Sequence, residues 1–146
     1  MRLALFQPDI PQNTGTIMRL CGCFGVGLDI IEPCGFAFSD AKMRRAGMDY
    51  IDLVEYRRHI SWAEFLSERK GRLILIETDG KTPYSEFEFL PDDILLLGRE
   101  SAGTPDYVYP QCDHSIFIPQ KAGRSLNVAM AGAIVLSHAL CKVGEL

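Results

Sequence analysis

Short apolar runs alternate with helix-like segments along almost the whole chain, and this alternation constrains the fold more than any other feature. The run Ile94–Leu97 holds four consecutive apolar residues, as is typical of a strand buried on both faces of a sheet. Further strands are expected at residues 3–6, 28–31, 72–77 and 115–118. Because strands that alternate with helices form parallel sheets covered on both sides, the predicted fold is α/β, with a mostly parallel sheet and helices on both faces.

Capping residues and stop signals place the helices between these strands. Helices are expected at residues 13–24, 39–46, 61–69, 105–111 and 125–142. Pro11 and Gly25 are typical start and stop signals for the first helix. Ser61 and Glu64 stand in the spacing of a capping box. A short edge strand is expected at residues 51–55.

Size and composition indicate one soluble globular domain that spans residues 1–146. Charged residues make up 23% and hydrophobic residues 47% of the chain, as in ordinary globular proteins. No apolar run approaches the ~20 residues that a membrane span needs, so no membrane partner is expected. The five cysteines are odd in number and include no CxxC pair, which favours a reduced, cytoplasmic setting over a disulfide framework or a zinc site.

The charge pattern argues against indiscriminate binding to nucleic acid, because the formal net charge is −4. Basic residues nevertheless cluster at Arg44 and Arg45 and again at Arg57 and Arg58. Composition alone leaves two interpretations open for these clusters, namely a solvated charged face and a phosphate-binding patch.

The last predicted helix is apolar around nearly its whole circumference. A helix on the surface of a single domain shows one apolar stripe, so this helix is expected to be buried on more than one side. Two covers are compatible with the pattern: a second protomer in a twofold homodimer, or the rest of the same chain around a central helix.

Three loops share one character: each follows a predicted strand and leads toward a helix. They span residues 7–19, 98–105 and 119–127. In a parallel sheet they emerge at the same edge, where α/β proteins bind their ligands and helix N-termini favour anions. The chain contains no P-loop, dinucleotide fingerprint, GxSxG or HExxH motif, and its histidines lack metal-ligand spacing. A small-molecule site without metal is predicted there. A Cys–His nucleophilic pair is not excluded by the spacing.

Four segments of the chain together resemble the SPOUT superfamily of knotted RNA methyltransferases. They are PDIPQNTGTIMRLC (8–21), IIEPCGFAFSDAKMRRAGMDY (30–50), LLLGRESAGTP (95–105) and IPQKAGRSLNVAMA (118–131). Within the superfamily they look most like the small tRNA 2′-O-methyltransferases that act on the wobble nucleotide.

The resemblance implies both a fold and an activity. It implies a deep C-terminal trefoil knot, a homodimer, and S-adenosyl-L-methionine as methyl donor, with S-adenosyl-L-homocysteine as product. The acceptor it implies is the ribose 2′-OH of the wobble nucleotide of tRNA, cytidine-34 or a modified uridine-34. Two further readings stay open: a 2′-O-methyltransferase for another tRNA or rRNA position, and a non-catalytic RNA-binding module of the same fold.

The resemblance also assigns roles to individual residues. The expected cofactor-binding residues are Ile76, Gly98, Ile118, Ser125 and Leu126. The expected catalytic residues are Asn13, Arg19 and Glu100, and the expected substrate-binding residues are Arg44, Arg45 and Asn127. Since arginine stays protonated in proteins, our hypothesis is that Arg19 orients the 2′-hydroxyl and an adjacent phosphate instead of acting as a base.

Three positions depart from the family pattern. Arg99 stands where a proline is common, Ala102 where a basic residue is frequent, and Thr104 where an apolar residue is frequent. These departures leave the cofactor assignment intact. For Arg99, a surface charge and an RNA phosphate contact are both compatible with the sequence.

Overall fold

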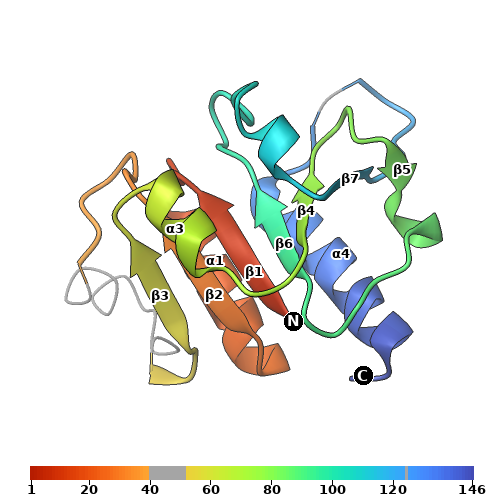
Figure 1. Cartoon of the computed structure of the whole chain (residues 1–146), viewed down its shortest axis with the longest axis horizontal. Coiled ribbons are helices and arrows are strands. Elements are labelled where there is room, and N and C mark those ends of the chain that lie inside the picture. Colours follow the sequence, from red (N-terminus) through yellow and green to blue (C-terminus); the bar gives the residue numbers. More distant parts are fainter. Residues whose placement is uncertain (40–51, 124) are drawn as a thin grey trace.

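A single parallel sheet organises the molecule (Figure 1). The computed structural model describes residues 1–39, 52–123 and 125–146. Within this part the sheet has seven strands in the order β3-β2-β1-β6-β4-β7-β5, and every neighbouring pair is parallel. The strands are β1 (Arg2–Phe6), β2 (Gly27–Ile31), β3 (Tyr56–His59), β4 (Leu73–Ile76), β5 (Thr82–Pro83), β6 (Ile94–Leu97) and β7 (His114–Phe117). The predicted α/β fold with a parallel sheet is confirmed.

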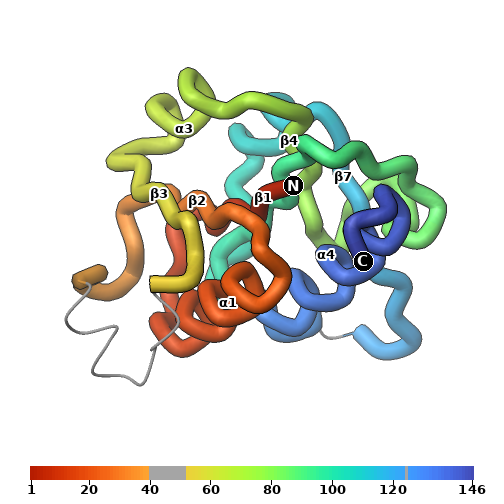
Figure 2. Tube along the Cα trace, turned by 90° about the horizontal axis from the view of Figure 1, so that it is seen from below, coloured from red at the N-terminus to blue at the C-terminus, as the bar shows by residue number. Residues whose placement is uncertain are grey.

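Helices cover both faces of this sheet, as predicted. Helices α1 (Pro11–Phe24) and α4 (Val128–Val143) lie side by side on one face, and α3 (Trp62–Glu68) lies on the other (Figure 2). Two short 3₁₀ helices, η2 (Tyr84–Glu86) and η3 (Tyr109–Gln111), complete the described elements. None of the helices in these three described stretches is long and apolar enough to cross a membrane.

Two hydrophobic cores follow from the alternation of side chains along the strands. Leu3 and Leu5 of β1 face α1 and α4, whereas Ala4 and Phe6 face α3. Phe6 packs edge-on against Trp62 of α3, with ring centroids 5.3 Å apart. Strands β1, β4 and β6 are buried on both faces, and continuous apolar runs are typical of such strands.

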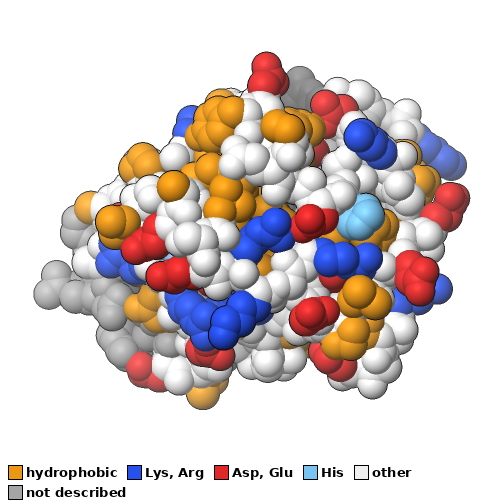
Figure 3. Space-filling view, viewed as in Figure 1, with side chains coloured by type: hydrophobic (Ala, Val, Ile, Leu, Met, Phe, Trp, Pro, Cys, Tyr) orange, Lys and Arg blue, Asp and Glu red, His pale blue; other side chains and the backbone are white. Residues whose placement is uncertain are grey.

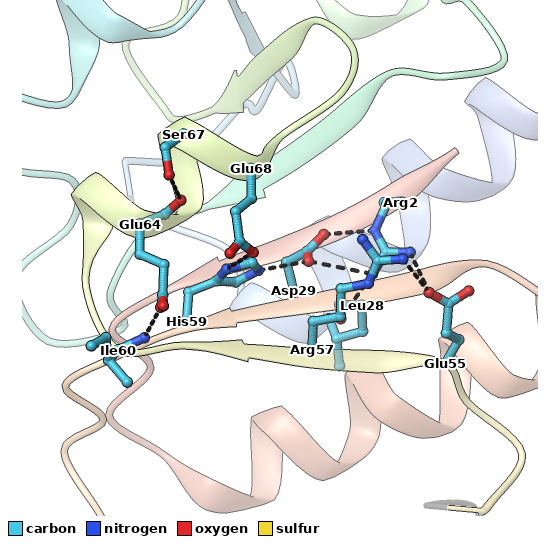
Figure 4. Close-up of polar contacts among 10 residues, drawn as sticks. All are labelled: Arg2, Leu28, Asp29, Glu55, Arg57, His59, Ile60, Glu64, Ser67 and Glu68. Atoms are coloured by element: carbon cyan, nitrogen blue, oxygen red, sulfur yellow. Dashed lines mark hydrogen bonds and ion pairs between the residues drawn. The ribbon is translucent and has the colours of Figure 1, made fainter.

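A buried ionic cluster ties the three strands at one end of the sheet together (Figure 4). Asp29 of β2 is only 4% exposed. Its carboxylate accepts from Arg2 Nε of β1 at 2.7 Å and contacts His59 Nε2 of β3 at 2.9 Å. Because a buried charge is costly unless it is paired, these contacts stabilise the register of β1, β2 and β3.

Helix α4 is not buried all round by its own chain. Its buried face consists of Ala129, Gly132, Val135, Leu136, Ala139 and Leu140. On the opposite side, Met130 is 57% exposed. The alternative of a central helix covered by its own chain is therefore wrong, and the cover by a second protomer stays a prediction.

Two of the predicted elements are wrong in position or type. The edge strand expected at 51–55 lies at Tyr56–His59, where Leu28 and Ile31 of β2 set its register. The helix expected at 105–111 is a turn followed by the three-residue η3. Pro110 explains the second error, because it has no N–H to donate to the carbonyl of Asp106, as an α-helix over these residues would require. The helix expected at 39–46 falls almost entirely on residues 40–51, outside the described part.

The strand order brings the loops that follow β6 and β7 close to each other. Strand β6 is inserted between β1 and β4, and β7 lies on the far side of β4. The loops that follow β6 and β7 therefore emerge near each other, at the carboxyl ends of central strands. The trefoil knot concerns how the chain threads through these loops, and it stays a prediction.

Candidate active site

A cavity of about 410 Å³ opens at the carboxyl ends of β4, β6 and β7. This is the edge of a parallel sheet at which α/β proteins bind their ligands. All five residues expected to bind the cofactor line it: Ile76, Gly98, Ile118, Ser125 and Leu126. Asn13, Glu100 and Asn127 also line it. The structure thus gathers eight of the eleven predicted site residues around one cavity, and their individual roles remain predictions.

The loop after β6 folds tightly because two of its positions are glycine. A Cβ atom at Gly98 would lie 2.3 Å from Thr104 Oγ1, so no larger residue fits without moving that side chain. Gly103 has φ +64°, a left-handed conformation that glycine adopts without strain. Its N–H donates to the carbonyl of Arg99 at 3.1 Å, which turns the loop back over the cavity.

Asn127 fixes the start of α4. Its Oδ1 accepts from the N–H groups of Ala129 and Met130, at 2.9 and 3.2 Å. The sequence predicted that the helix begins at Ser125. The cap instead begins it at Val128, and residues 125–127 form a loop before it. Ser125 and Leu126 consequently face the cavity from a loop instead of from a helix.

A chain of side-chain hydrogen bonds joins three loops beside the cavity. Asn127 Nδ2 donates to Asn13 Oδ1 at 3.0 Å, and Asn13 Nδ2 donates to Glu100 Oε1 at 3.2 Å. Glu100 Oε2 accepts from the N–H of Asp9 at 2.8 Å. The Asp9 carboxylate in turn accepts from the N–H and the hydroxyl of Ser101. The predicted polar residues therefore brace one another across the loop after β1, the loop after β6 and the start of α4.

The predicted basic residues lie elsewhere. Arg19 is exposed on α1 and is not among the residues that line the cavity. It stands six residues beyond Asn13, roughly 9 Å along the helix axis. Arg44 and Arg45 lie outside the described residues. A single chain thus does not bring Arg19 to the cavity.

Several residues that line the cavity were not predicted as site residues, and Glu77 and Gln120 are two of them. Glu77 follows β4 directly, and its Oε2 accepts from Thr104 Oγ1 at 2.9 Å. Its position after a strand was the available signal, but no motif contains it. Gln120, in the loop after β7, also lines the cavity.

Arg99 is not a freely solvated surface charge, and its contact with an RNA phosphate stays a prediction. It is half-buried, and its guanidinium lies 5.5 Å from the centroid of the Phe6 ring. Its Nε is buried without a hydrogen-bond partner. An arginine held over an aromatic ring in this way keeps its remaining donors free to meet a ligand at the cavity mouth.

Three of the five cysteines are unsuited to nucleophilic chemistry. All five are free thiols. Burial raises the pKa of Cys34 to about 11 and that of Cys112 to about 11. It raises the pKa of Cys21 to about 12. Since the thiolate is the reactive form, these three thiols stay protonated and inert near neutral pH.

On the face that carries α3, Lys and Arg side chains form one contiguous group at the lower left, and Asp and Glu side chains border it (Figure 3). Elsewhere on this face, Lys and Arg side chains alternate with Asp and Glu. Arg69 lies 2.8 Å from Asp113, and Arg72 lies 2.8 Å from Asp93. Pairing of this kind weakens the attraction of this face for phosphates.

Comparison with known proteins places this site in a family. The model of the SpoU rRNA Methylase family matches residues 1–137. A tRNA (cytidine(34)-2'-O)-methyltransferase of Beijerinckia indica subsp. indica is 54% identical over 148 residues, which cover 99% of this chain and 92% of that protein. The corresponding protein of Escherichia coli strain K12 is 36% identical, with 99% of this chain and 94% of that protein covered.

Solved structures agree with this placement. One that concerns the 2-OH methylation of C/U34 on tRNA superposes with a TM-score of 0.89 at 37% identity, covering 97% of this chain and 94% of that one. An AdoMet-bound rRNA methyltransferase from Sinorhizobium meliloti superposes with a TM-score of 0.83 at 27% identity, covering 96% of this chain and 55% of that one. The resemblance to the SPOUT superfamily is confirmed, and the chain belongs to the SpoU rRNA Methylase family.

Proposed function

We propose that this protein transfers a methyl group from S-adenosyl-L-methionine to the ribose 2′-OH of the wobble nucleotide of tRNA, cytidine-34 or a modified uridine-34. One observation carries the proposal. The motif residues gather around a single cavity, in a chain that is 54% identical, over nearly its full length, to a tRNA (cytidine(34)-2'-O)-methyltransferase.

The cavity fits the proposed cofactor in size and chemistry. Its volume of about 410 Å³ lies within the range of small-molecule sites. Ile76, Ile118 and Leu126 offer apolar surface for an adenine ring. Gly98 lets backbone groups approach the ligand, and the carboxylates of Glu77 and Glu100 favour a ligand with positive charge. When bound, S-adenosyl-L-methionine supplies an activated methyl group on a sulfonium. A related structure holds AdoMet.

The chain's own residues then position the acceptor. Asn13 and Glu100 are held by hydrogen bonds beside the cavity, where they present amide and carboxylate groups in fixed orientation. We assign Arg19 the orientation of the 2′-hydroxyl and an adjacent phosphate through its planar guanidinium. The hydroxyl proton leaves to solvent or to an RNA phosphate.

Arg19 does not line the cavity of its own chain. In a homodimer, the Arg19 of one protomer can act on an acceptor bound at the cavity of the other, and this supports a homodimer. The exposed side of α4 around Met130 offers an apolar surface for a second protomer. Substrate contacts are assigned to Arg44, Arg45 and Asn127. Because the net charge is −4, tRNA binding through a local basic patch is expected to weaken steeply with salt. The proposed place of action is the cytoplasm, consistent with five free thiols.

One experiment tests the activity. The protein is incubated with methyl-labelled S-adenosyl-L-methionine and total tRNA, and the modified riboses are mapped. Label on the ribose of nucleotide 34 is the expected result. Cofactor binding without transfer supports an RNA-binding module instead, and failure to bind the cofactor overturns the proposal.

A second target class follows from the family description, which names rRNA. The same assay with ribosomal RNA covers this alternative. If label appears in rRNA or at another tRNA position, and none appears at nucleotide 34, the labelled RNA is the substrate instead.

A further inference from the structure

An acidic residue without a charged partner stands in the cavity wall. Glu77 follows β4 directly and is half-buried. Its Oε2 accepts from Thr104 Oγ1 at 2.9 Å, and its Oε1 accepts from the N–H of Thr78 at 3.2 Å. A carboxylate has about four acceptor positions, so both oxygens can accept a further hydrogen bond.

The Glu77 carboxylate lines the cavity beside two glycines, Gly98 and Gly103. Ile76 pairs with Leu97 across β4 and β6, so Glu77 and Gly98 follow side by side. A Cβ atom at Gly98 would lie 3.2 Å from Glu77 Oε2, and one at Gly103 would lie 3.9 Å from it. The absence of a side chain at Gly98 lets Thr104 reach Glu77, and the Glu77 carboxylate remains part of the cavity lining, where a ligand group can contact it.

The contacts of Glu77 differ from those of the structural acids in this protein. Asp93 and Asp29 are each paired with an arginine, Arg72 and Arg2. No ion pair of Glu77 occurs in the part of the chain that is described. It is held instead by the hydroxyl of Thr104, at a position where the resembling family often has an apolar residue. The pair Glu77–Thr104 is thus a feature of this chain that orients a carboxylate and leaves its charge uncompensated.

An oriented carboxylate in this place suits the hydroxyls of a ribose. In dinucleotide-binding sheets, an acidic residue binds the ribose hydroxyls close to the glycine-rich turn that follows another strand. Here Glu77 ends β4 and Gly98 begins the glycine-containing loop after the adjacent β6. We propose that Glu77 binds the ribose hydroxyls of the adenosine part of the methyl donor, and that Thr104 is the positioning residue for its carboxylate. The inference rests on the proposed cofactor.

Calorimetric binding with two ligands tests this. The ligands are S-adenosyl-L-homocysteine, which lacks the sulfonium charge, and its 2′,3′-dideoxy analogue. Hydrogen bonds to a charged group are strong, so the wild type is expected to bind the analogue about ten- to a hundredfold more weakly. Glu77→Gln should bind S-adenosyl-L-homocysteine more weakly by a similar factor. It should lose little further affinity for the analogue, because the two changes remove the same interaction.

Variants around Glu77 sharpen the test. Thr104→Val keeps the side-chain shape and removes the donor, so a loss of about three- to tenfold is expected with S-adenosyl-L-homocysteine and a smaller one with the analogue. Glu86→Gln, at an exposed acid of η2, is the matched control and should bind both ligands like the wild type. The ligand 5′-methylthioadenosine keeps the ribose and lacks the amino acid, and the loss in Glu77→Gln should persist with it.

The outcomes separate the two proposals. If the losses from Glu77→Gln and from the missing hydroxyls simply add, Glu77 does not bind the hydroxyls, and the inference is overturned while the proposed function stands. The same holds if the loss vanishes with 5′-methylthioadenosine. If the wild type binds no S-adenosyl-L-homocysteine, the proposed cofactor itself is wrong. Should Glu77→Gln fail to fold, as judged by circular dichroism, the Thr104→Val pair of measurements decides in its place.

Discussion

At the scale of single residues, the shape of the cavity depends on the absence of a side chain at Gly98. Two side-chain atoms from different loops, Thr104 Oγ1 and Glu77 Oε2, lie where a Cβ at this position would make contact. The cavity wall therefore has no room for a methyl group at position 98.

Gly98→Ala is accordingly expected to weaken S-adenosyl-L-methionine binding by about tenfold or more, because the added methyl displaces Thr104 and with it the Glu77 carboxylate. Calorimetric titration measures the effect. Gly123→Ala is the matched control, since a Cβ there meets nothing within 4 Å. Unchanged affinity in Gly98→Ala would show that the loop after β6 does not form the cofactor wall.

Arg19 gives a second residue-level prediction. Arg19→Lys keeps the positive charge but removes the planar fork. A fall of about tenfold or more in single-turnover methyl transfer is expected, with cofactor affinity unchanged because Arg19 lies outside the cavity lining. Near-normal turnover by the lysine variant contradicts the orienting role, whatever the activity of other variants.

At the scale of elements, the start of α4 serves stability and the site through one side chain. Asn127 caps the helix with Oδ1 and holds Asn13 with Nδ2. Asn127→Ala removes both contacts and is expected to lower the free energy of unfolding by about 1 kcal/mol. Asn127→Asp keeps an acceptor for the cap and removes the donor to Asn13. Urea unfolding should therefore resemble the wild type in the aspartate variant, whereas methyl transfer should fall in both. Normal methyl transfer by Asn127→Asp would show that the hydrogen bond from Asn127 to Asn13 is not needed for catalysis.

The ionic cluster on β1, β2 and β3 predicts a larger loss of stability. Asp29→Ala leaves Arg2 and His59 without their buried partner, at a cost of about 3–5 kcal/mol in the free energy of unfolding. Glu55→Ala removes the other acidic partner of Arg2. Because the Glu55 side chain is 65% exposed, its loss should cost about 0–1 kcal/mol in the free energy of unfolding. Urea unfolding of both variants checks the contrast. Equal losses would mean that burial does not decide the strength of this cluster.

The elements also show what a sequence pattern can and cannot predict. Strands β1, β4 and β6 were predicted because both of their faces are buried, so every residue in β4 and β6, and every residue of β1 after Arg2, is apolar. Strand β3 reads Tyr-Arg-Arg-His and was predicted too early, at residues 51–55, because backbone pairing to β2 and not apolar patterning keeps it in the sheet. The motif residues meet because parallel strands end at one edge. The contact between Glu77 and Thr104 depends on the register of β4 and β6, which no local pattern contains.

At the scale of the whole molecule, α4 leaves apolar surface uncovered on the side that does not face the sheet. Residues 130, 134, 137 and 141 recur at helical spacing along this side, and Met130 and Cys141 are exposed there. The helix reads as apolar all round because one side packs on its own sheet and the other is available to a second copy of the chain.

Met130→Glu is therefore expected to convert the proposed homodimer into a monomer, since a charge in an apolar twofold interface is placed against the equivalent charge of the second copy. Sedimentation velocity measures the change directly. Ile60→Glu, at a 76% exposed residue beside α3 on the opposite face of the sheet, is the matched control and should leave the assembly unchanged. A Met130→Glu variant that still dimerises removes α4 as the interface. A wild type that sediments as a monomer overturns the proposed homodimer, and Arg19 would then have to reach the acceptor from its own chain.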